Sequence, residues 1–234
     1  MEPIQIEYKF IFGRGDRKAF RLAMHPATLN LIRESMEEPP DWAELSFQIC
    51  PHCTLSETAD PYCPLALGLS AVMNPFTGKQ SFDKVVVVVK TGGRKVVLNS
   101  TVQRGLSSLM GLVIAASGCP HTAFLKPMAR FHLPMASDVE TVYRATSMYL
   151  LAQYFRLKQG LAPDLALAGL TERYRNLELV NIHVAKRLRA GAKADSMVNA
   201  VIILDTYAKI LPYSIDESLK ELGFLFSDYT SRDE

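Results

Sequence analysis

Three of the chain's four cysteines lie within fourteen residues, in the stretch ICPHCTLSETADPYCPLA. Cys50 and Cys53 form a CxxC pair, Cys63 follows them, and Cys119 stands apart. A CxxC turn presents two sulfur atoms on the same side, as a tetrahedral zinc ion requires. The pattern predicts a zinc site formed by Cys50, Cys53, Cys63 and Cys119, with His121 as an alternative to Cys119.

Three other interpretations of these cysteines remain open. A thioredoxin-like redox motif should open a helix inside a βαβ unit, but TLSETADPYCP is a poor helix start. An iron–sulfur cluster accepts four cysteines, yet the compact ferredoxin spacings are absent. Free cysteines are also often simply buried. Zinc is favoured because the CxxC pair and a third cysteine lie close together.

The fourth ligand decides whether the ion is structural or catalytic. Four protein ligands close a structural zinc site, whereas a catalytic site keeps one position for water or substrate. If Cys119 lay far away, His52, His121 or His132 could coordinate the ion or move protons. Three thiolates would also weaken the ion as a Lewis acid. The closed, structural site is therefore favoured.

The segment CPHTAFLKPMARFHLPMASDVET, residues 119–141, is the second candidate region. Prolines interrupt it, and such loops often carry functional side chains. Lys126 and Arg130 are candidates to bind a phosphate or carboxylate. Candidate catalytic residues, if the metal is catalytic, are His121, Arg130, His132 and Glu140. The alternative is that these side chains only cap helices or form structural hydrogen bonds.

Charge is unevenly distributed, although the net charge is only +2. Between Lys79 and Arg130 there are eight basic residues and a single acidic one, Asp83. Such a basic central strip attracts anionic ligands or partners, including nucleic acid. The alternative is that lysine and arginine protect the edges of strands against aggregation.

Composition is that of an ordinary globular protein, with 48% hydrophobic and 21% charged residues. The start, MEPIQIEYKFIFGRGDRK, does not resemble a signal peptide. The most apolar window, Leu106 to Ala116, is about half the length of a membrane-spanning helix. We therefore expect a cytoplasmic protein that does not enter a membrane.

Hydrophobic periodicity predicts an α+β protein with an antiparallel sheet in the N-terminal half and a helical bundle after it. The two parts, residues 1–103 and 104–234, are expected to form one compact unit joined around the metal site. Strands are predicted at Ile4–Phe12, Lys18–Met24, Ala43–Ile49, 84–90 and 95–103. Helices are predicted at 25–38, 64–73, 105–117, 137–158, 164–189, 194–211 and 214–223.

Three functions follow from these features. The favoured one is a zinc-stabilised soluble binding or interaction protein, whose basic central strip meets an anionic ligand or protein partner. The first alternative is a metal-dependent, hydrolase-like enzyme with its site in the segment 119–141. The second alternative is a nucleic-acid-binding protein, for which the support is weaker because charge alone does not identify a partner.

Overall fold

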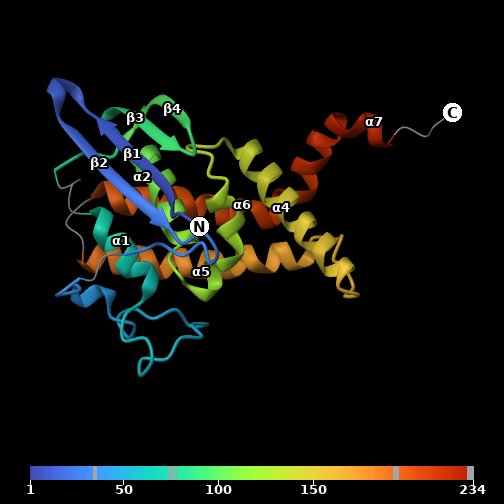
Figure 1. Ribbon diagram of the computed structural model, residues 1–234, viewed down its shortest axis with the longest axis horizontal. Coiled ribbons are helices and arrows are strands. Elements are labelled where there is room, and N and C mark those ends of the chain that lie inside the picture. The colour runs from blue at the N-terminus through green and yellow to red at the C-terminus, as the bar shows by residue number, and fades with distance from the viewer. Residues whose placement is uncertain (34–35, 74–75, 77, 192–194, 231–234) are drawn as a thin grey trace.

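The computed structural model describes residues 1–33, 36–73, 76, 78–191 and 195–230. A four-stranded antiparallel sheet of order β2-β1-β3-β4 forms one layer of the molecule, and helices form the other (Figure 1). The strands are β1 (Ile4–Ile11), β2 (Arg17–Met24), β3 (Lys84–Thr91) and β4 (Arg94–Thr101). This confirms the predicted α+β class with its sheet in the N-terminal half.

The sheet follows directly from alternation in the sequence. In β1, Ile6, Tyr8 and Phe10 are buried on the face that meets the helices. Five consecutive valines form β3, whose β-branched side chains favour an extended backbone. Gly92 and Gly93 connect β3 to β4 with φ angles of 51° and 81°, which residues with a side chain seldom adopt.

Helices follow the sheet and cover one of its faces (Figure 1). The longer helices are α1 (Pro64–Met73), α2 (Val102–Ala115), α4 (Asp138–Lys158), α5 (Ala168–Gly191) and α6 (Asp195–Leu222). The short ones are η1 (Gly13–Gly15), η2 (Asp41–Ala43), η4 (Pro120–Leu125), α3 (Lys126–Arg130), η5 (Gly223–Phe226) and α7 (Ser227–Thr230). Buried side chains from the sheet, α2, α5 and α6 belong to the same hydrophobic cluster.

Helix α2 lies against the sheet at an unusually close approach. A methyl group on Gly105 would lie 2.7 Å from Cε1 of Phe10 and 2.9 Å from Cγ2 of Val87. Both distances are shorter than van der Waals contact. Glycine therefore allows the backbone of α2 to pack directly on the aromatic and valine side chains of β1 and β3.

The predicted helix at 25–38 is wrong for the residues that the structure describes there. After β2 the chain turns, and Nδ1 of His25 accepts hydrogen bonds from the backbone N–H groups of Ala27 and Thr28, both at 3.2 Å. Leu31 then pairs with Met24 in an isolated antiparallel bridge. The side chain of His25 thus stabilises a turn in place of a helical first turn, and residues 34–35 lie outside the described part.

The predicted strand Ala43–Ile49 is also wrong. Ala43 belongs to η2, and Glu44 forms no more than an isolated bridge, to Tyr62. The backbone carbonyls of this segment accept hydrogen bonds from the side chain of Arg187 on α5. Tertiary contacts therefore take the carbonyl groups that a ladder of strand hydrogen bonds would need.

The helical half agrees with the sequence at its start and differs further on. Ser137 and Glu140 form the predicted capping box at the start of α4. The proline-rich segment before it, predicted to be extended, contains the short helices η4 and α3. The predicted break between residues 211 and 214 is absent, since α6 continues to Leu222.

Candidate functional site

The four cysteines lie at turns and helix starts where the backbone is held by hydrogen bonds. The N–H of Cys53 donates to the carbonyl of Cys50 at 3.0 Å, which closes the CxxC turn. Cys63 directly precedes α1, and its N–H donates to the carbonyl of Ala43 at 2.8 Å. Cys119 directly precedes η4, and its N–H donates to Oγ of Ser117 at 3.1 Å.

Direct contacts bring these separate turns together. The imidazole rings of His52 and His121 have centroids 4.0 Å apart. Nε2 of His121 donates to the backbone carbonyl of His52 at 2.6 Å. On the other side, a Cβ atom on Gly118 would lie 3.9 Å from Cβ of Pro64. The CxxC turn and the start of α1 therefore both border the segment that carries Cys119.

The four thiols are near enough to influence one another's ionisation. Burial raises the pKa of Cys50 to about 12, and the negative charges of Cys63, Cys119 and Cys53 contribute to this increase. Burial likewise raises the pKa of Cys119 to about 11, again with contributions from Cys63 and Cys53. Without a cation between them, Cys50 and Cys119 are protonated at neutral pH.

The segments that carry the cysteines are adjacent, but the side chains do not form a completed metal site. In the described part of the chain, no group of three or more His, Cys, Asp or Glu side chains is arranged to hold a metal ion, and the four cysteines are not joined by disulfides. Both ring nitrogens of His52 are buried, and neither has a hydrogen-bond partner among the described residues. Burial, followed by the neighbouring His121, lowers the pKa of His52, which disfavours its cationic form. The predicted zinc site therefore stays a prediction.

Helix α5 anchors the segment that leads into the CxxC turn. Arg187 is only 3% exposed and donates hydrogen bonds to the carbonyls of Trp42, Glu44 and Leu45 at 2.8, 2.6 and 2.9 Å. Nδ1 of His183, one turn earlier, lies 3.1 Å from the carbonyl of Gln48. Sequence reasoning missed Arg187. Its signal was its spacing from the buried Val180 and Val184, seven and three residues earlier, which places it on the apolar face of the helix.

The four predicted catalytic side chains do not gather around the cysteines. Of His121, Arg130, His132 and Glu140, only His121 contacts the cysteine loop, through His52. The carboxylate of Glu140 accepts hydrogen bonds from the N–H and Oγ of Ser137, as part of the capping box. The predicted grouping of a histidine with Glu140 is therefore not seen, because the helix start holds this carboxylate.

Lys126 and Arg130, the predicted anion-binding pair, are at opposite ends of the short helix α3. Arg130 is exposed, and its guanidinium lies 5.3 Å from the centre of the Phe131 ring. Lys126 is partly buried. Joint binding of an anion by these two side chains stays a prediction.

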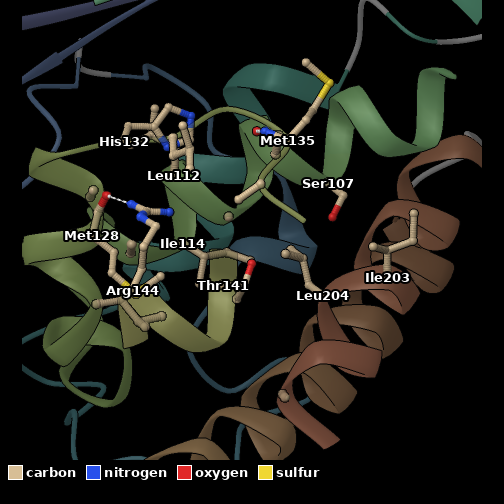
Figure 2. Close-up of a pocket in the computed structure, with 18 of the residues that line it drawn as sticks. Ser107, Leu112, Ile114, Met128, His132, Met135, Thr141, Arg144, Ile203 and Leu204 are labelled. Carbon is tan, nitrogen blue, oxygen red and sulfur yellow. Dashed lines mark hydrogen bonds between the residues drawn. The ribbon is translucent and has the colours of Figure 1, made fainter. Parts of the chain in front are cut away.

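A cavity of about 180 Å³ lies between α2, α3, α4, α5 and α6 (Figure 2). Sequence reasoning missed it, because its walls come from helices that are distant along the chain. Most of the lining is apolar and includes Leu112, Ile114, Met128, Leu177 and Leu204. Several polar side chains also line it, among them Ser108, His132, Thr141, Arg144 and Asn181.

His132 belongs to a buried hydrogen-bond chain at one side of this cavity. Its Nε2 lies 2.5 Å from the hydroxyl oxygen of Tyr8, which lies 2.8 Å from Oγ of Ser108. Oγ of Ser108 also accepts from the N–H of Met135. Burial, followed by the positive charge of Arg144, lowers the pKa of His132 to about 4. At neutral pH the imidazole is therefore uncharged, and its Nε2 shares a hydrogen bond with the hydroxyl of Tyr8.

Arg144 and Asn181 contribute unused hydrogen-bond donors to the cavity. Figure 2 shows Arg144 beside Met128, and Nη2 of Arg144 donates to the carbonyls of Met128 and Phe131 at 3.0 and 2.9 Å. Nδ2 of Asn181 is buried and has no hydrogen-bond partner among the described residues. Buried donors without acceptors are uncommon in proteins, so this amide marks a position where a ligand atom can bind.

The basic central strip is divided in space. Nζ of Lys79 pairs with Asp16 at 2.6 Å, near one end of the sheet. Lys90 lies opposite Glu7 near the other end, with their charged groups 3.7 Å apart. Six residues of extended strand, about 20 Å, separate Lys84 from Lys90. The strip therefore supplies separate local patches in place of one continuous basic surface.

A shallow depression of about 570 Å³ lies at the tip of the β3–β4 hairpin. Its charged lining residues are Glu7, Arg21, Lys90, Arg94 and Lys95. Arg21 and Lys90 form ion pairs with Glu7. Arg94 and Lys95 are exposed and have no ion pair among the described residues. The hairpin tip thus carries an excess of positive charge.

No single helix in the described ranges has the length and hydrophobicity to cross a membrane. Val102–Ala115 and Pro120–Arg130 meet these criteria only when taken together, and they are bent by 111° relative to each other.

The fold and the sites define an α+β protein in which gathered cysteines lie outside a largely apolar cavity. Residues 6–227 match the family described as Domain of unknown function (DUF6901), and the chain belongs to this family. No curated protein and no solved structure matches the chain significantly.

Proposed function

We propose that this chain is a zinc-stabilised binding protein that presents the tip of its β3–β4 hairpin to an anionic protein partner. The observation that supports the zinc proposal is the adjacency of the three segments that carry Cys50 with Cys53, Cys63 and Cys119, whose thiols influence one another's ionisation. These thiols are mutually repulsive when ionised, and a divalent cation converts that repulsion into attraction.

Four thiolates suit zinc because the ion prefers tetrahedral coordination by sulfur or nitrogen. Coordination requires that the thiols lose their protons, so metal binding reverses the raised pKa values of Cys50 and Cys119. Cys119 is favoured over His121 as the fourth ligand, since Nε2 of His121 already donates to the carbonyl of His52. Binding draws the CxxC turn, the start of α1 and the start of η4 towards the ion.

A structural role has more support than a hydrolytic one. The carboxylate of Glu140 belongs to a helix cap, and His132 is hydrogen-bonded to Tyr8. Neither side chain is positioned to activate a water molecule beside the cysteines. Coordination by four thiolates also leaves no position for substrate.

The anionic partner is inferred from the charge at the hairpin tip. Arg94 and Lys95 project where β3 turns into β4, and Glu7 is the acidic residue that lines the depression there. This carboxylate already has three cationic neighbours, Lys9, Arg21 and Lys90. Arg94 and Lys95 have no carboxylate partner among the described residues. An acidic protein surface would supply such partners.

Elemental analysis of tag-free protein, prepared under reducing conditions without chelators, tests the zinc proposal. We expect about one zinc ion per chain. Cys63→Ser should lose the metal and lower the melting temperature, because the loop closed by the ion becomes free. Thr58→Ser, a small change at an exposed position of the same loop, is the matched control and should keep both.

The zinc proposal fails if the purified chain contains no stoichiometric metal or if Cys63→Ser retains it. Stoichiometric iron together with visible absorbance would identify an iron–sulfur cluster instead. Hydrolysis that disappears in the cysteine variant while its fold persists would favour the enzyme alternative.

A further inference from the structure

We propose that the cavity between α2, α3, α4, α5 and α6 binds a small carboxylate that carries a compact apolar group. Arg144 and Asn181 would receive the carboxylate, while the apolar lining surrounds the rest of the ligand. This site is separate from both the cysteine cluster and the hairpin tip. The inference therefore holds whether or not the chain binds zinc.

Asn181 provides the first argument. Its side chain is only 2% exposed on α5, and its Nδ2 has no hydrogen-bond acceptor among the described residues. A buried donor left unsatisfied costs about 1–3 kcal/mol. Leucine has a similar volume and would avoid this cost. The amide N–H₂ of Asn181 therefore gains an acceptor when a ligand oxygen enters the cavity.

Arg144 provides the second argument. Its Nη2 donates to the carbonyls of Met128 and Phe131, which fix the guanidinium at the wall of the cavity. Its Nε and Nη1 groups have no acceptor among the described residues. No carboxylate there lies within ion-pair distance of it. Either group can donate a single charge-assisted hydrogen bond to a ligand carboxylate.

The electrostatic balance of the cavity selects an anion. Arg104 and Arg144 line it, and none of its described lining residues is acidic. His132 also lines the cavity, and it is uncharged at neutral pH because burial lowers its pKa. Glu140, outside the lining, acts on Arg144 only at longer range than an ion pair. A ligand with one negative charge therefore supplies a direct partner for Arg144, whereas a cationic ligand would meet repulsion.

The remaining walls set the size and character of the ligand. Apolar side chains from α2, α3, α5 and α6 form them, as Figure 2 shows for Leu112, Met128 and Leu204. A cavity of about 150 Å³ holds a benzene molecule. The volume here, about 180 Å³, therefore fits one aromatic ring or a short alkyl chain beside the carboxylate. Arg104 and Leu133 are exposed at the rim, where such a ligand can enter.

Titration calorimetry with matched pairs of probes tests this proposal. Benzoate and hexanoate carry the carboxylate, and benzyl alcohol and hexanol are their neutral counterparts. We expect the carboxylates to bind at least about tenfold more tightly, since a hydrogen bond to a charged group is worth about 1.5–3 kcal/mol. Equal affinity of acid and alcohol, or no binding of either acid at millimolar concentration, would overturn the proposal.

Asn181→Leu separates this cavity from other anion-binding surfaces. Leucine preserves the volume, so the variant should fold at least as stably as the wild type and bind benzoate about tenfold more weakly. Asn176→Leu is the matched control, because it makes the same change on α5 at a residue outside the cavity lining, whose side chain bonds to Glu172. Unchanged benzoate affinity in folded Asn181→Leu would contradict the assignment.

Arg144→Gln provides an independent check. Glutamine keeps an N–H₂ group for the carbonyls of Met128 and Phe131 but removes the positive charge. We expect this variant to lose the preference of the cavity for benzoate over benzyl alcohol while still binding the neutral probe. A retained preference in a variant with native unfolding behaviour would show that the anion binds elsewhere.

Discussion

Arg187 is a buried cation whose charge is satisfied by backbone carbonyls. It is 3% exposed and joins α5 to residues 42–45 through three hydrogen bonds. Removing the guanidinium leaves three carbonyls without their donor. Arg187→Met should therefore lower the free energy of unfolding by about 3 kcal/mol. Denaturant unfolding measures this change, and Arg189→Met, at an exposed position on the same helix, should alter it little.

His132 makes stability depend on pH. Its pKa in the folded protein is about 4, below the ordinary value of 6.5, so the unfolded chain binds a proton more readily between these values. Stability should fall as the pH decreases from about 6.5 to about 4. His132→Gln should weaken this dependence in melting curves recorded across that range.

The matched control for His132 is His25→Gln, which replaces an exposed histidine that bonds to its own turn. We expect its pH dependence to follow that of the wild type. If His132→Gln retains the full loss of stability on acidification, another group, such as His52, is responsible.

Helix α2 meets the sheet without room for an additional methyl group at Gly105. Gly105→Ala should therefore destabilise the protein by about 1–3 kcal/mol, because Phe10 and Val87 must shift. Two turns along, a methyl group on Gly111 would lie 3.4 Å from the flexible end of Leu204. Gly111→Ala should be neutral or stabilising by up to about 1 kcal/mol, since alanine favours the helix. Thermal and denaturant unfolding of both variants compare the two positions.

Local patterns predicted the elements that depend on nearby residues. The alternating apolar residues of β1 and the valines of β3 specify strands, and Ser137 with Glu140 specifies the start of α4. Where distant side chains compete for the backbone, local patterns fail. Arg187 lies about 140 residues from the carbonyls that it binds, so nothing near Ala43 could have indicated that its predicted strand is absent.

The same contrast between nearby and distant residues applies to the candidate sites. The CxxC spacing and the scarcity of other cysteines predicted that Cys119 joins Cys50, Cys53 and Cys63; the structure places the segment of Cys119 beside His52 and Pro64, and the metal site itself stays a prediction. The cavity could not be anticipated, since its position depends on how helices pack. Its polar residues, Arg144 and Asn181, lie in helices whose sequences resemble ordinary amphipathic ones.

The surface charge of the intact protein should determine its partner. Replacing both Arg94 and Lys95 with Glu should abolish binding of a polyglutamate probe at low ionic strength, and in the wild type added salt should weaken this binding. Replacing Lys186 and Arg189 with Glu makes the same change in net charge on α5 and should preserve binding. Fluorescence anisotropy measures the affinities.

Tighter binding of single-stranded DNA than of polyglutamate, lost in the same hairpin variant, would favour the nucleic-acid alternative. Failure of both polymers to bind the wild type at low ionic strength would remove the support for an anionic partner at this surface.

The long-range bonds of Arg187 also bear on how the protein forms during translation. Residues 42–45 leave the ribosome about 140 residues before their anchor on α5. The growing chain therefore carries its cysteine turn without this support until α5 has been synthesised. The proposed zinc ion would consequently find its final geometry only after α5 has emerged, and until then the thiols would be open to oxidation.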